Sequence, residues 1–87
     1  MMWTDIASEA ESADQKYGPF RSTHEGLGVL MEEVHELIEA IRLNSPDHVR
    51  NEAIQVSAVA YRIAQSLDHE ETRARSGMTQ AMLPFSG

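Results

Sequence analysis

The sequence predicts an all-α protein built on an antiparallel helical hairpin, with a short helix in front of it. Two segments, residues 24–43 and 47–67, carry apolar residues at alternating intervals of three and four, the period of an amphipathic helix. Only Asn44-Ser45-Pro46 separates them, and so short a connection makes the two helices antiparallel neighbours. The 87 residues suffice for one domain, and cysteine is absent, so disulfides and thiolate metal sites are excluded.

Local signals place the first two helices. A weak apolar stripe of isoleucine and alanine predicts a short helix over residues 3–16, and Gly18-Pro19 ends it. Ser22, followed three residues later by Glu25, has the spacing of a capping box, which predicts that the second helix begins near His24. Its apolar seam consists of Leu27, Leu30, Val34, Leu37 and Ile41.

The third helix is expected over residues 47–67, with Ser45 as a cap and Pro46 at the first helical position. Its seam consists of Val49, Ala53, Val56, Ala60, Ile63 and Leu67. Residues 68–87 are more charged and are interrupted by glycine and proline. We expect a C-terminal tail there, outside a helical domain of residues 1–67, with one short helical turn around residues 78–83.

Several apolar side chains lie outside both seams and need another surface. They are Val29, Met31, Ile38, Ile54, Val59 and Tyr61. We therefore expect a homo-oligomer, a dimer or tetramer, in which two hairpins complete a four-helix bundle. The alternative is that the first helix and the tail cover the same residues.

The charge balance limits the possible partners. The chain has 14 acidic and 7 basic residues, a formal net charge of −7. This argues against non-specific nucleic-acid binding and against an anionic membrane surface, because both require a basic face. The sequence also lacks an apolar run long enough to span a membrane, and its first residues do not resemble a signal peptide, so a cytoplasmic location is expected.

A metal site is predicted from the positions of four polar residues. Glu33 and Glu36 fall on one flank of the second helix, and Glu52 and Gln55 fall on the flank of the same rotational sense on the third. Antiparallel helices that face each other bring like flanks together. Three carboxylates and an amide oxygen then suit Mg²⁺ or Mn²⁺. The alternative is that these residues belong to ordinary solvated faces, since glutamate is a good helix former.

At these residues the sequence resembles the MazG-like family of all-α nucleoside triphosphate pyrophosphohydrolases. The first half of the family pattern stands as Glu32-Glu33-Val34-His35-Glu36 and the second as Glu52-Ala53-Ile54-Gln55. The lead-in Lys16-Tyr17-Gly18-Pro19-Phe20, with His24-Glu25-Gly26, is also similar to bacterial and phage members, so the resemblance covers residues 16–67. Gln55 stands where the family pattern has aspartate, and its carbonyl oxygen brings no charge to the metal.

The resemblance implies Mg²⁺-dependent hydrolysis of a nucleoside triphosphate to the monophosphate and pyrophosphate. Glu33, Glu36 and Glu52 would be metal ligands, with Gln55 beside them, and Glu32 or Glu36 would take the proton of the attacking water.

Residues around the mouth of the second helix are candidates for substrate binding. Lys16 and Arg21 would neutralise phosphates, Tyr17 or Phe20 would stack on the base, and His24 would contact the substrate. Each also has a structural interpretation, as surface cations, loop-packing aromatics and a helix-start histidine. Two other functions stay open: a non-catalytic module that holds a nucleotide or metal, with Gln55 as the disabling change, and a purely structural helical interaction protein.

Overall fold

The prediction of an all-α protein is confirmed. The computed structural model describes residues 2–77, with side chains to Asp68, and this part of the chain forms three helices and no strand. They are α1 (Met2–Tyr17), α2 (Thr23–Arg42) and α3 (Pro46–Gly77). The helical turn expected around residues 78–83 lies outside the described residues.

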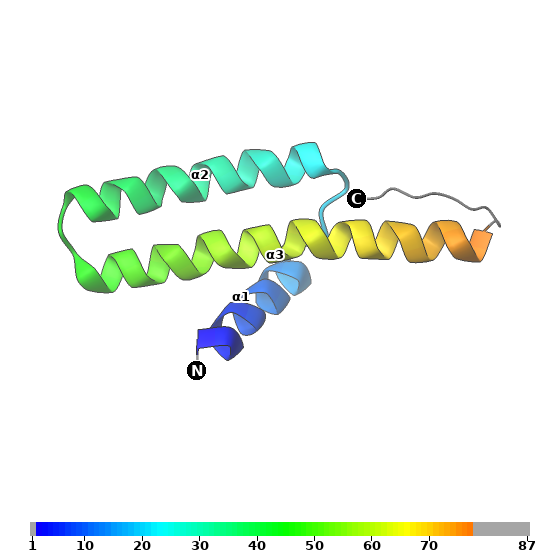
Figure 1. The fold of residues 1–87 in the computed structure, drawn as a ribbon, viewed down its shortest axis with the longest axis horizontal. Coiled ribbons are helices and arrows are strands. Elements are labelled where there is room, and N and C mark those ends of the chain that lie inside the picture. Colours follow the sequence, from blue (N-terminus) through cyan, green and yellow to red (C-terminus); the bar gives the residue numbers. More distant parts are fainter. Residues whose placement is uncertain (1, 78–87) are drawn as a thin grey trace.

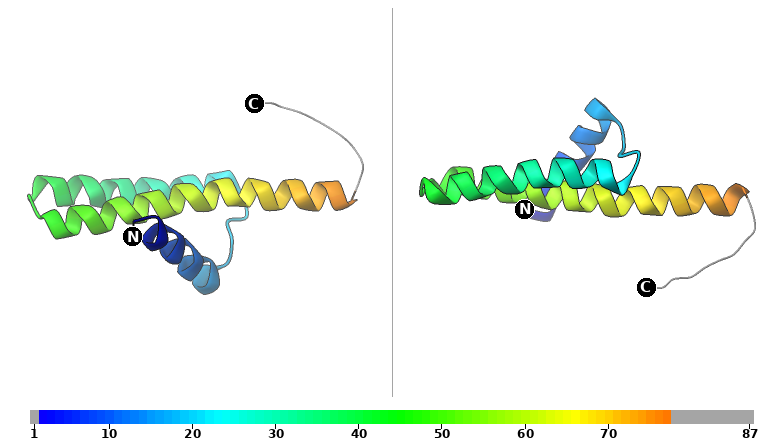
Figure 2. Two further views of the ribbon diagram at one scale, coloured as in Figure 1. Left: turned by 60° about the horizontal axis from the view of Figure 1, so that its bottom comes forward. Right: turned by 90° about the horizontal axis from the view of Figure 1, so that it is seen from above.

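Helices α2 and α3 run antiparallel and side by side, while α1 crosses α3 obliquely on one face of this hairpin (Figures 1 and 2). Within the described chain, α1 packs on α3, but no Cα atom of α1 lies within 8 Å of one in α2. Helices α1 and α2 therefore both pack on α3 but do not pack on each other. None of these helices has the length and apolarity required to cross a bilayer.

The predicted cap at the start of α2 is confirmed. The Ser22 hydroxyl accepts a hydrogen bond from the Glu25 backbone N–H (3.1 Å), and the Glu25 carboxylate accepts one from the Arg21 N–H (2.7 Å). The return bond thus reaches one residue further back than in a standard capping box. Pro46 is the first residue of α3, as expected, and the preceding turn places Asn44 at φ 53°.

Helix α3 is longer than predicted, because it continues to Gly77 and does not end near Leu67. No proline or glycine occurs between residues 68 and 76, and more than half of that segment is glutamate, arginine and alanine, which favour helix. Apolar residues are sparse there, so the apolar period that predicts the helix ends before the helix does.

The buried core lies between α1 and α3, where Ile6 and Ala10 pack on Ile54 and Ala58. The first helix therefore covers Ile54, as the alternative to oligomerisation required. Several other apolar residues stay open: Met31, Ile38 and Tyr61 are 62%, 43% and 46% exposed.

The predicted seam of α2 is partly wrong. Leu27, Val34 and Ile41 are 48%, 37% and 54% exposed, so three of the five seam residues are not buried against α3. Helix α2 instead packs on α3 through an adjacent strip in which Gly26 and Ala40 are buried. These small residues let the backbones of α2 and α3 approach closely. Packing through them is therefore favoured over packing through the larger side chains of the neighbouring strip.

Two glycines of α2 give a matched test of this packing. A Cβ on Gly26 would lie 2.6 Å from Cγ1 of Ile63, whereas a Cβ on Gly28 would meet nothing within 4 Å. We expect Gly26→Ala to lower the free energy of unfolding by about 1–2 kcal/mol, because overpacking exceeds the gain in helix propensity. Gly28→Ala should raise it by about 0.5–1 kcal/mol. Urea unfolding measures both changes, and equal effects at the two sites would contradict the packing described.

Candidate metal centre

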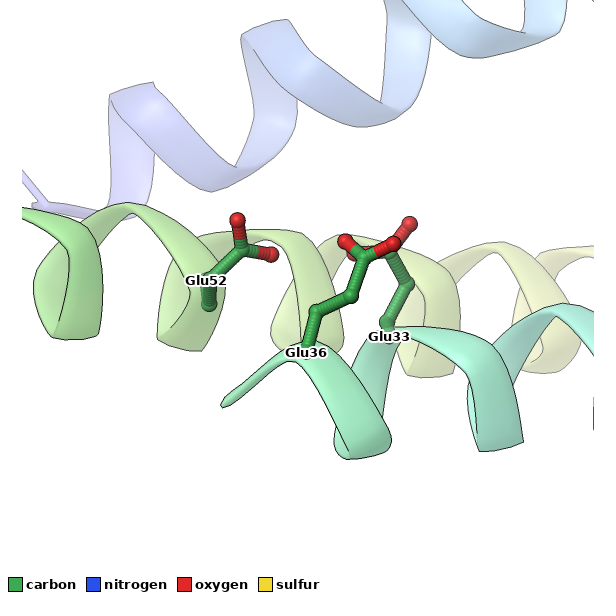
Figure 3. A group of neighbouring side chains, drawn as sticks. All are labelled: Glu33, Glu36 and Glu52. Atoms are coloured by element: carbon green, nitrogen blue, oxygen red, sulfur yellow. The ribbon is translucent and has the colours of Figure 1, made fainter. Parts of the chain in front are cut away.

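Three glutamates from two helices meet at one point of the hairpin. Glu33 and Glu36 are one turn apart on α2, and Glu52 lies opposite them on α3 (Figure 3). Each residue offers one carboxylate oxygen, and the three oxygens lie within 4.8 Å of one another. Their carboxylates point to the face of the hairpin on which α1 lies. The sequence-based placement of these side chains on like flanks is confirmed, while their role as metal ligands stays a prediction.

The carboxylates of this centre lack partners that would offset their negative charge. One oxygen each of Glu33 and Glu52, Oε1, is buried without a hydrogen-bond partner. None of the ion pairs found among residues 2–68 involves any of the three glutamates. A buried carboxylate oxygen without a partner is costly, and like charges this close repel one another.

The pKa of Glu33 is raised by this environment. Burial raises it from its ordinary value of 4.5 to about 6, with further contributions from the charges of Glu36 and Glu52. When Glu33 is protonated, a hydrogen bond to Glu52 adds to the shift. When both are ionised neither can donate, and their buried oxygens are left unpaired. A divalent cation would satisfy all three carboxylates at once, so the donor set fits a hard, oxygen-preferring ion such as Mg²⁺ or Mn²⁺.

A cleft of about 510 Å³ opens beside the centre. Helices α1 and α2 form its walls, α3 forms its floor, and the residues connecting α1 to α2 form one end. It is lined by Glu9, Ser12, Ala13, Lys16, Tyr17, Gly18, Phe20, Glu25, Val29, Glu32, Glu33, Gln55, Ala58, Val59 and Arg62.

The cleft brings together only some of the predicted substrate-binding residues. Lys16 and Tyr17 line it, with the Lys16 ammonium 5.4 Å from the centre of the Tyr17 ring. Arg21 and His24 are exposed and do not line it, so their predicted role has no support from this cleft. Glu32 is exposed and also lines the cleft, next to Glu33 in the sequence.

Sequence reasoning missed Arg62, which holds α1 and the following loop on α3. Its side chain is 6% exposed. Nε donates to Asp14 Oδ1 (2.8 Å), Nη2 donates to the Gly18 carbonyl (3.1 Å), and the guanidinium stacks 4.1 Å from the centre of the Phe20 ring. The available signal was that Arg62 is the one charged residue between positions 53 and 67.

The raised pKa of Glu33 predicts a pH dependence of the metal-free protein. Since the folded-state pKa lies above the ordinary value, folding favours the protonated form, and this stabilisation is present below pH 4.5 and lost as the pH rises through about 6. We expect wild type, relative to Glu33→Gln, to lose about 1 kcal/mol between pH 4.5 and 7.5, a value reduced for partial solvent screening.

Urea unfolding in EDTA at the two pH values measures this difference. Added Mn²⁺ should restore the stability of wild type at pH 7.5 but not that of Glu33→Gln. A difference between the two proteins that is the same at both pH values would contradict the electrostatic description of the centre.

Comparison of the chain with protein-family models, with curated protein sequences and with solved structures finds no match.

Proposed function

We propose that this protein is a Mg²⁺-dependent nucleotide pyrophosphohydrolase that converts a nucleoside or deoxynucleoside triphosphate to the monophosphate and pyrophosphate. The observation that carries the proposal is the convergence of Glu33, Glu36 and Glu52 within 4.8 Å, with two buried oxygens unpaired. Mg²⁺, or Mn²⁺ in its place, is the proposed cofactor.

We propose a role for each part of the site. Glu33, Glu36 and Glu52 would hold the cation, which supplies charge stabilisation on the phosphates and lowers the pKa of water. Glu32, which lines the cleft next to Glu33, would accept the proton as water attacks the α-phosphorus and the bond from this phosphorus to the oxygen bridging the α- and β-phosphates breaks, releasing pyrophosphate. Lys16 lines the adjacent cleft, where it would contact the bound nucleotide. The resemblance of residues 16–67 to MazG-like enzymes gives the same assignment of the glutamates.

Pyrophosphate release from each of the eight common ribo- and deoxynucleoside triphosphates, with Mg²⁺ and with EDTA, tests the activity. Mg²⁺-dependent release from at least one nucleotide supports the proposal. If none is cleaved but Mn²⁺ still binds, the chain is a non-catalytic metal or nucleotide module. If neither occurs, a structural interaction protein is the remaining function.

We further propose that two hairpins associate as a homodimer through the exposed apolar stripe of α2, the first step towards the four-helix bundle. The α2 stripe consists of Leu27, Met31, Val34, Ile38 and Ile41. Its members recur at intervals of four and three, the pattern of a helix-packing seam, and all are at least 37% exposed. A nucleotide substrate also favours the cytoplasm as the location.

The α2 stripe predicts a monomer-forming variant. The wild type should have twice its chain mass of 9.7 kDa in light scattering, and Ile38→Glu should have the monomer mass, because a charge in the seam would be buried without a partner. Leu43→Glu is the control, since Leu43 is also exposed but follows the last turn of α2 outside the stripe. A monomeric wild type would exclude this interface.

A further inference from the structure

The cleft between α1 and α2 extends directly from the metal centre. Glu33 belongs to both, because its carboxylate takes part in the three-glutamate cluster and its side chain lines the cleft. A ligand whose phosphates lie at the metal can therefore place the rest of the molecule in this cleft, across the floor formed by α3.

The charge of the cleft selects which part of a nucleotide enters it. Glu9, Glu25 and Glu32 line it, whereas Lys16 is the lining cation whose charge is not engaged by a carboxylate. Arg62 lines it too, but its guanidinium is already bound to Asp14 and Gly18. Such a cleft repels phosphate and accepts an uncharged group, so the nucleoside fits it and the polyphosphate does not.

Gln55 is the uncharged polar residue on the floor of the cleft. It lies one turn after Glu52 on α3, is half-buried, and is followed along the floor by Ala58 and Val59. No hydrogen bond to its amide is present among residues 2–68. A planar amide with one donor and one acceptor side, next to the aliphatic side chains of Ala58 and Val59, matches the edge of a nucleobase.

We propose that Gln55 determines base specificity by hydrogen-bonding to the base of a nucleotide bound in this cleft. The inference rests on the proposed function and gives Gln55 a role different from the metal ligand predicted from the sequence; Glu33, Glu36 and Glu52 remain the proposed ligands. A base with an adjacent donor and acceptor satisfies the amide, and a base that mismatches leaves it unpaired, which is the basis of strong discrimination.

Binding of the (α,β-imido)triphosphates of adenosine, guanosine, cytidine and uridine tests this role, because these analogues resist cleavage at the proposed bond. Calorimetry with Mn²⁺ present should show that wild type prefers one base at least tenfold. Gln55→Met keeps the length of the side chain and removes the amide, and it should reduce the preference to about threefold or less. Gln65→Met is the matched control, because Gln65 is also half-buried on α3 but lines a different hollow.

The outcomes separate the two proposals. Titration with Mn²⁺ alone should give the same affinity in wild type and Gln55→Met, and a tenfold loss would show that Gln55 is a metal ligand instead. Analogues that bind wild type equally well, or a preference that survives in Gln55→Met, overturn the specificity role while leaving the proposed function standing. If wild type binds no analogue, both fail.

Discussion

Glu52→Gln is expected to lose at least about 100-fold in the rate of pyrophosphate release, because it removes the one carboxylate that α3 contributes to the metal centre. Changes next to metal ligands already cost 10–100-fold in metal affinity or activity, and the loss of a direct ligand costs more. Calorimetry should show a parallel loss of Mn²⁺ affinity, while far-UV circular dichroism shows the same helix content.

The same variant should gain stability in EDTA, which distinguishes loss of a ligand from loss of the fold. Glu52 repels Glu33 and leaves a buried oxygen unpaired, so its neutralisation relieves both penalties in the metal-free protein. Glu39→Gln is the control, since Glu39 is an exposed glutamate of α2 paired with Arg42. If Glu52→Gln binds Mn²⁺ with the same affinity as wild type, Glu52 is not a metal ligand.

Arg62→Leu is expected to lower the free energy of unfolding by roughly 3 kcal/mol. The substitution leaves the Asp14 carboxylate and the Gly18 carbonyl without their donor and removes the stacking on Phe20. Because these contacts hold α1 and the loop on α3, the wall of the cleft should loosen as well. A small domain has a total stability of about 5–15 kcal/mol, so the loss is a large fraction.

Arg50→Leu is the comparison for Arg62, because it breaks the other ion pair between α1 and α3. Arg50 and Asp5 are 3.2 Å apart, but their side chains are 55% and 43% exposed. A pair in this environment is worth at most about 1 kcal/mol. Urea unfolding of both variants measures the contrast. Equal losses in the free energy of unfolding would contradict the claim that the buried contacts of Arg62 stabilise the fold more than the exposed pair of Arg50.

Local signals made the hairpin predictable. Ser22 and Pro46 mark helix starts through chemistry confined to one turn, and the predicted starts agree with the structure within a residue. The convergence of Glu33, Glu36 and Glu52 was also predictable, because helix geometry and antiparallel packing alone determine it.

Features set by tertiary packing were not predictable in the same way. Helix α2 carries two adjacent apolar strips, and periodicity does not distinguish which one packs on α3, although buried Gly26 and Ala40 explain the choice once it is seen. The contact of Arg62 with Asp14 joins residues 48 apart in the chain, so no local pattern indicates it. The cleft depends on the position of α1, which this contact helps to fix.

Anomalous diffraction from a crystal soaked in Mn²⁺ tests the metal centre most directly. We predict one ion bound by carboxylate oxygens of Glu33, Glu36 and Glu52, at about 2.0–2.3 Å from each, with the remaining positions taken by water or phosphate oxygens. An ion that occupies another site while these three side chains bind none would contradict the account.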